Sequence, residues 1–206
     1  MHGTIRRVAA VATACVAATS AAIAGAGPAA AAGWYITPGG NFSATSAPWA
    51  ATDGSTGTQL VCTSLKLTGQ LGQGQVPGPV IGNVNGFGAV ACKVGPLPVT
   101  VAFTGFSWSM TPTTWISSTS TVVGTLGSVG AHVAGSACTF DIGGSTPGGL
   151  ATVPFSYRNT THSLTIGGTG ATHVWNASCL GLIASGDAIA FGGTFDVEPP
   201  QSIVPA

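Results

Sequence analysis

Short runs with large apolar side chains at every second position constrain this chain most, because that spacing fits a β-strand with one buried face. In residues 97–104 the large apolar side chains fall on odd positions, and in residues 106–110 they fall on even positions. The phase changes after Gly105, where one extra residue in a β-bulge would turn the next side chains to the opposite face. Residues 153–157 and 189–197 alternate in the same way.

Glycine and proline punctuate these runs at short intervals, as at Asp53-Gly54, Pro147-Gly148 and Gly186-Asp187. No amphipathic helix is evident after the first 32 residues. Together these signals predict an all-β, single-domain antiparallel β-sandwich or partly closed barrel of short strands. The polar stretch 111–121 is expected to be a long loop or a polar edge strand rather than a linker between two lobes.

The first 32 residues have the pattern of a secretory signal peptide. Arg6 and Arg7 precede an uncharged apolar run, and the run ends in the small residues Ala30, Ala31 and Ala32. We therefore predict a signal peptide at residues 1–32 and a secreted all-β domain at residues 33–206. Cys15 follows small residues within the apolar run, so a lipid anchor at Cys15 is the minor alternative.

Four cysteines follow the predicted signal peptide: Cys62, Cys92, Cys138 and Cys179. An even number in an exported chain indicates two disulfides, for which three pairings are possible. We favour Cys62–Cys92 and Cys138–Cys179, because this pairing closes one loop in each half of the chain. Each bridge is expected to stabilise the fold by roughly 3–4 kcal/mol. A zinc site is the weaker alternative, because no CxxC or HxH spacing occurs.

Charge is scarce in the predicted mature chain, which has three basic and five acidic residues. We therefore expect neither nucleic acid nor anionic lipid as a partner, because both require clustered Lys and Arg. No window after Gly33 has 18 uninterrupted apolar residues, so no transmembrane segment is predicted. The sequence leaves the oligomeric state open.

No established catalytic motif is present: there is no GxSxG, HExxH, P-loop or EF-hand pattern. The three remaining histidines are expected to be structural. By alternation His132 should face solvent, His162 should lie in a turn, and His173 should share a face with Trp175.

The acidic residues also give no clear catalytic pair. Asp187 follows a glycine in an expected tight turn, and Glu198 precedes Pro199-Pro200, which suggests a solvated chain end. A triad of one histidine with Asp141 or Asp187 and a serine is a weaker alternative. We therefore predict no catalytic residues, no metal site and no cofactor.

Trp49 and Trp115 are the candidates for ligand stacking. Trp49 follows a proline and Trp115 lies among Thr and Ser, so both are expected to be exposed, whereas Trp108 alternates with apolar residues as in a core. Exposed indoles of this kind stack on sugar rings in carbohydrate-binding β-sandwiches.

Several segments together resemble a family of small secreted actinobacterial proteins without an established activity. The matching stretches are residues 60–64, residues 81–84 with Phe87 and Cys92, and residues 95–97, 123–125, 179–187 and 191–197 with Pro199. The resemblance implies secretion and the two cysteine pairs, and it assigns no catalytic or binding residue.

These observations predict an exported, non-catalytic protein with a structural or interaction role outside the cell or in the cell envelope. Cell-wall polysaccharide and another envelope protein are the expected partners. A carbohydrate-binding module using exposed tryptophans is the first alternative, and a secreted hydrolase with an unrecognised site is the second.

Overall fold

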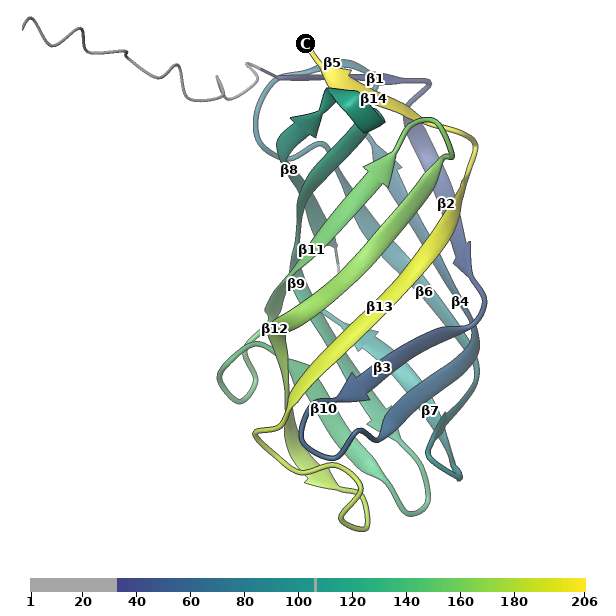
Figure 1. Cartoon of the computed structure of the whole chain (residues 1–206), viewed down its shortest axis with the longest axis vertical. Helices are drawn as coiled ribbons and strands as arrows, with labels where there is room; N and C mark the ends of the chain where they lie inside the picture. The colour runs from purple at the N-terminus through teal and green to yellow at the C-terminus, as the bar shows by residue number, and fades with distance from the viewer. Residues whose placement is uncertain (1–32, 106) are drawn as a thin grey trace, which may run out of the picture.

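The computed structural model describes residues 33–105 and 107–206. The predicted signal peptide, including Cys15, lies outside the described residues. Within them, the structure is almost entirely β (Figure 1). The strands are β1 (Trp34–Thr37), β2 (Gly40–Ser46), β3 (Trp49–Asp53), β4 (Gln59–Leu71), β5 (Gly74–Val76), β6 (Gly82–Val94), β7 (Leu97–Thr104), β8 (Trp108–Ile116), β9 (Thr121–Ala134), β10 (Thr139–Gly143), β11 (Ala151–Arg158), β12 (Ser163–Ser178), β13 (Ala188–Glu198) and β14 (Ser202–Pro205). A single 3₁₀ turn, η1 (Ser117–Thr119), separates β8 from β9.

The strands of the main sheet pair in antiparallel fashion and form a ring. The ring has eight strand positions, some of them occupied by two short strands in line. β2 and β3 run in line beside β4, β7 and β8 in line beside β9, and β10 and β11 in line beside β12. The circuit returns to its start because β13 pairs with β12 on one side and with β2 and β3 on the other. The predicted all-β antiparallel class is therefore confirmed, in the form of the partly closed barrel.

The ring is incomplete between β6 and β7. β6 pairs with β7 only at Cys92–Val94 and with β8 only at Gly82–Val84. Between these contacts no ladder joins the described parts of the two strands, and aromatic side chains bridge the space instead. The Phe87 ring lies 4.8 Å from the Phe103 ring and 4.2 Å from the Trp108 ring, measured between centroids.

Several strands are longer than the sequence pattern predicts. β4 and β6 have 13 residues each, β9 has 14 and β12 has 16. The expectation of short strands was wrong for these elements because a change of face does not end a strand. In β9 the buried side chains pass from Leu126 to Val129 around Ser128, whose φ is +64°, while the strand continues.

The phase change predicted at Gly105 is confirmed. Gly105 and Ser107 have φ values of +75° and +74°, and β7 ends before them while β8 begins after them. Gly135 lies in the turn between β9 and β10, where its N–H donates to the carbonyl of Cys138 at 2.8 Å. Residues 111–116 belong to β8 and pair with β9, which agrees with the polar edge strand expected there.

Apolar side chains fill the interior of the barrel. The inward rows include Leu60, Leu67, Leu126, Phe140 and Phe195, each at most 1% exposed. The cavity between Trp49, Phe103, Trp108 and Phe191 has a volume of about 20 Å³. A space of that size holds about one water molecule. The cavity is therefore too small for an organic ligand.

Both predicted disulfides are present. Cys62–Cys92 joins opposed residues of β4 and β6, and Cys138–Cys179 joins the residues next to the paired ends of β10 and β12. The favoured pairing is thus confirmed.

The C-terminal segment closes the upper end of the barrel in Figure 1. β14 pairs with β1, and β1 pairs with β5, so three short strands form a separate cap sheet. Gln201, between β13 and β14, is 1% exposed. The solvated chain end expected after Glu198 was therefore wrong, because Pro199 and Pro200 redirect the chain into the cap.

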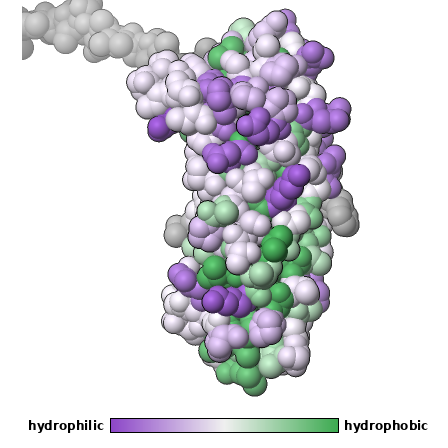
Figure 2. Space-filling view, turned by 90° about the vertical axis from the view of Figure 1, so that its right-hand side faces the viewer, coloured by the Kyte–Doolittle hydropathy of each residue, from purple (hydrophilic) through white to green (hydrophobic). Residues whose placement is uncertain are grey.

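The surface changes along the long axis. Figure 2 shows mainly hydrophilic residues near the cap and a concentration of apolar residues over the lower half. Val90 and Leu180 are large apolar side chains with 55% and 75% exposure. Within the described ranges, no helix is long and apolar enough to cross a membrane.

Candidate functional site

A cluster of polar side chains lies on the outer face of the lower barrel, where β9, β10 and β12 are adjacent. His132 of β9 is directly opposite Asp141 of β10, and its Nδ1 lies 2.6 Å from Asp141 Oδ1. On the other side, Asn176 of β12 donates its Nδ2 hydrogen to Asp141 Oδ2 at 2.7 Å. Alternation turns His132 and Asp141 outward, and antiparallel register makes them neighbours. Asn176 has a φ of +52° and reaches the same carboxylate from the position after Trp175, which is directly opposite Asp141.

Asp141 is held in its ionised form by these contacts. The amide of Asn176 lowers the pKa of Asp141, and the hydrogen bond and charge of His132 lower it further against a small opposing effect of burial. A carboxylate only accepts hydrogen bonds, so Nδ1 of His132 carries the hydrogen of this contact and Nε2 faces away from Asp141. The two side chains are 50% and 40% exposed, and solvent therefore weakens the interaction.

A shallow depression of about 120 Å³ adjoins Asp141. Its lining includes Trp175 on β12, Thr104 on β7 and Leu150 at the end of the loop between β10 and β11. A hydrogen bond joins that loop to β12: Trp175 Nε1 donates to the carbonyl of Gly144 at 3.0 Å. Trp175 is half-buried, and Leu150 is 49% exposed. We call this depression, together with His132 and Asn176, the outer groove.

The tryptophans predicted to stack on ligands do not form this groove. Trp49 is only 4% exposed and contacts Phe103 and Phe191 inside the barrel, so its expected exposure was wrong. The cause is the break after Ala47 and Pro48, which places Trp49 on the inward row opposite Cys62. Trp115 is half-buried and packs against the core. Trp175 is the half-buried indole on the outer face.

The other histidines are in the surroundings that the sequence predicts. His162 lies in the turn between β11 and β12, with φ at +52°. His173 lies on the same face as Trp175, with its ring centroid 6.3 Å from the indole. Its Nδ1 is 3.5 Å from the carbonyl of Gly186, whereas the carboxylate of Asp187 accepts from Ser55 and Ala184. A triad of His173, Asp187 and serine is therefore not assembled.

The outer groove contains one ionised carboxylate and one imidazole. No hydroxyl group of the described residues hydrogen-bonds to a histidine ring. No group of three or more His, Cys, Asp or Glu side chains in the described ranges is arranged around a common point for a metal. The arrangement instead offers an indole face, a fixed acceptor and two further polar groups to a ligand.

Sequence reasoning identified His132 as solvent-facing but did not connect it with Asn176 or Trp175. The signal that was available is alternation, which places His132, Asp141 and Trp175 on outward rows. Their proximity depends on strand register, because Asp141 and Asn176 are 35 positions apart.

The fold and groove define a class: a disulfide-linked antiparallel barrel with eight strand positions, a filled interior and a polar groove on its outer surface. Comparison with known proteins finds no matching family model, no similar curated protein and no similar solved structure. Function is therefore inferred from the groove itself.

Proposed function

We propose that this chain is an exported, non-catalytic binding protein and that its outer groove takes a carbohydrate. The observation that carries the proposal is the meeting of the half-buried indole of Trp175 with the ionised Asp141 carboxylate on adjacent strands. An indole face packs against the C–H face of a sugar ring, and a fixed carboxylate accepts hydrogen bonds from sugar hydroxyls. The expected ligand is extracellular or cell-wall polysaccharide.

Export is supported by the predicted signal peptide and by the two disulfides, since such bridges persist in oxidising compartments. The resemblance to small secreted actinobacterial proteins points in the same direction and remains a prediction.

A binding role fits the groove better than hydrolysis. Glycoside hydrolysis generally uses two carboxyl groups across the scissile bond, one of them able to donate a proton. Asp141 is the carboxylate of this groove, and its lowered pKa keeps it ionised at neutral pH. Its hydrogen bonds to Asn176 and His132 fix its orientation, as recognition requires.

The test is retention of the purified, oxidised protein on a panel of insoluble polysaccharides and soluble oligosaccharides. We expect one class to retain the protein and Trp175→Ala to weaken binding at least tenfold, because truncating an anchoring aromatic removes more than about 1.4 kcal/mol. Trp115→Ala is the matched control and should bind normally, since Trp115 packs against the core. Asp141→Asn should weaken binding less than Trp175→Ala.

Failure of the intact protein to bind any carbohydrate in the panel would reject the proposal. Release of reducing sugars from a retained polysaccharide, abolished by His132→Ala, would instead support the hydrolase alternative.

A further inference from the structure

Two acidic side chains meet at the lower end of the barrel, away from the outer groove. Asp53 is the last residue of β3 and is 1% exposed. It is opposite Ile189 of β13, so Asp187, two positions earlier, is its diagonal neighbour on the same face. Asp187 is half-buried and precedes β13 directly.

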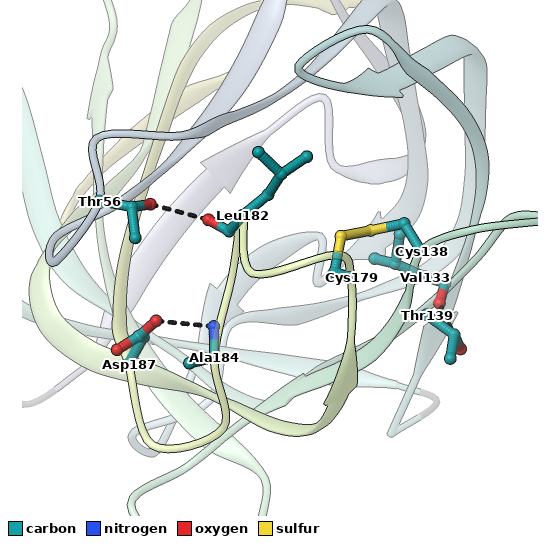
Figure 3. Close-up of a disulfide and its surroundings, with 8 residues drawn as sticks. All are labelled: Thr56, Val133, Cys138, Thr139, Cys179, Leu182, Ala184 and Asp187. Carbon is teal, nitrogen blue, oxygen red and sulfur yellow. Dashed lines mark hydrogen bonds between the residues drawn. A yellow bond between two sulfur atoms is a disulfide. The ribbon is translucent and has the colours of Figure 1, made fainter.

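Protein donors satisfy three of the four carboxylate oxygens. Asp53 Oδ1 accepts from the backbone N–H groups of Ser55 and Thr56, each at 2.8 Å. Asp187 Oδ1 accepts from the Ser55 hydroxyl at 2.9 Å. Asp187 Oδ2 accepts from the Ala184 N–H at 2.8 Å, a bond drawn in Figure 3. Asp53 Oδ2 is buried and has no hydrogen-bond partner in the described structure.

No basic side chain of the described residues forms an ion pair with Asp53 or Asp187. The one ion pair among the described residues is the distant His132–Asp141 contact. The Asp187 carboxyl is the diagonal neighbour of Asp53, whose buried Oδ2 has no partner among the described residues. Burying a polar oxygen without a partner is costly, so a further group is expected at this oxygen.

We propose that Asp53 and Asp187 form a binding site for a calcium ion. Asp53 Oδ2 and the Asp187 carboxylate supply the charged ligands, and the Ser55 hydroxyl oxygen retains lone pairs for the ion while donating to Asp187. All these donors are oxygen atoms, which select hard cations such as Ca²⁺ and Mg²⁺ over zinc. Water completes the coordination, as Ca²⁺ takes six to eight oxygen ligands.

Calcium fits the site better than magnesium because the donors lie at the end of β3 and in two irregular loops. Residues 54–58 join β3 to β4, and residues 179–187 join β12 to β13. Ca²⁺ tolerates variable geometry, whereas Mg²⁺ requires nearly ideal octahedral geometry. The ion would hold these loops together beside the hydrogen bond from Thr56 Oγ1 to the carbonyl of Leu182, at 2.8 Å, and near Cys138–Cys179 (Figure 3).

The experiment uses the full exported protein with both disulfides intact. Isothermal titration at pH 7.5 with CaCl₂, after removal of metals by EDTA and dialysis, should give one site with Kd of about 10⁻⁴–10⁻³ M, the range of extracellular calcium modules. At 10 mM, CaCl₂ should raise the thermal midpoint by roughly 2–8 °C, and MgCl₂ should raise it less.

Asp53→Asn should abolish both the binding heat and the calcium-dependent shift. Asp196→Asn is the matched control, because Asp196 is an exposed carboxylate on β13, and it should respond like the wild type. If Asp53→Asn does not fold, Asp187→Asn replaces it.

Absence of both binding heat and midpoint shift in the wild type at 10 mM CaCl₂ would overturn the proposal. In that case, the thermal midpoint in EDTA is compared between pH 5 and pH 8. If it falls as the pH rises for the wild type and does not fall for Asp53→Asn, the two carboxyls share a proton instead of a cation.

Discussion

The two ends of the barrel are closed by different means. At the upper end the cap sheet brings backbone strands across the opening, and side-chain hydrogen bonds join the C-terminal segment to the barrel. The Tyr157 hydroxyl donates to the carbonyl of Gln201 at 2.8 Å and accepts from the Gln201 N–H at 3.1 Å. Asn159 binds both the carbonyl and the N–H of Ile203, at 2.8 and 2.9 Å.

At the lower end, loops and a covalent bridge take the place of a cap sheet. Cys138–Cys179 links β10 to β12 there, and the loop that follows Cys179 contacts residues 55 and 56 through Asp187 and Leu182. This end also contains the buried unpaired oxygen of Asp53, and the outer groove lies on the outer face of the same half. Both proposed binding sites therefore lie in the half that is closed by loops rather than by a sheet.

Removing Cys138–Cys179 should have the largest effect on this comparison. Replacing both cysteines with alanine is expected to lower the free energy of unfolding by about 2–5 kcal/mol. Urea unfolding measures that change, and amide hydrogen exchange locates it. Exchange should rise at residues 179–187 and remain slow in the cap. The matched pair Cys62→Ala with Cys92→Ala lacks this local effect; equal loss of protection in the cap would contradict the separation of the two ends.

Tyr157→Phe should weaken the upper end by the next largest amount. It removes one hydroxyl that both donates and accepts in a buried site, which costs about 1–3 kcal/mol. Urea denaturation measures the loss, with Tyr35→Phe as a control on the exposed face of β1, where the change should be below about 0.5 kcal/mol. An unchanged unfolding midpoint for Tyr157→Phe would show that the hydrogen bonds of the Tyr157 hydroxyl add no stability.

High pH should break the same hydrogen bonds between Tyr157 and Gln201. Burial raises the pKa of Tyr157 to about 12, although the Gln201 N–H, which donates to the hydroxyl oxygen, opposes the shift. The raised pKa means that this stabilisation is complete below the unfolded value near 10 and is lost as pH rises to about 12. Stability measured from pH 9 to pH 12 should therefore fall more steeply for the wild type than for Tyr157→Phe. Parallel curves would exclude Tyr157 as the responsible group.

Asp141→Asn should have the smallest effect on stability, below about 1 kcal/mol, because Asp141 is well exposed to solvent. The pKa of Asp141 is lowered, so its contribution is present above the unfolded value near 4 and is lost as pH falls through the folded value. The variant should therefore lose less stability than the wild type between pH 5 and pH 2. A large destabilisation at neutral pH would show that the outer groove is a structural element.

Local patterns predicted much of the fold because alternation reports which face of a strand is buried. Leu97–Thr104 and Ala188–Glu198 were recognisable as strands, and the phase change at Gly105 corresponds to a real break. The same reasoning divided long strands wrongly wherever one residue with positive φ, such as Ser128, reverses the face inside a continuous ladder. It also predicted that Trp49 is exposed, whereas the break between β2 and β3 at Ala47 and Pro48 turns this side chain into the barrel.

The candidate site was less predictable, because its residues are distant in sequence. His132, Asp141 and Trp175 each have a predictable outward direction, yet their meeting requires the register of β9, β10 and β12. Asp53 was expected only to form a turn with Gly54. Its contact with Asp187 depends on the pairing of β3 with β13, which closes the ring.

The sequence by itself determined the all-β class, the scarcity of charge and a cysteine set whose favoured pairing the fold confirms. These properties follow from composition and short-range periodicity. Only the tertiary structure decided that the ends of the main sheet meet, that the C-terminal segment becomes a cap, and that Asp141 lies beside Trp175. Strand pairing is non-local, and a period of two specifies the face of a side chain but not its neighbour across the sheet.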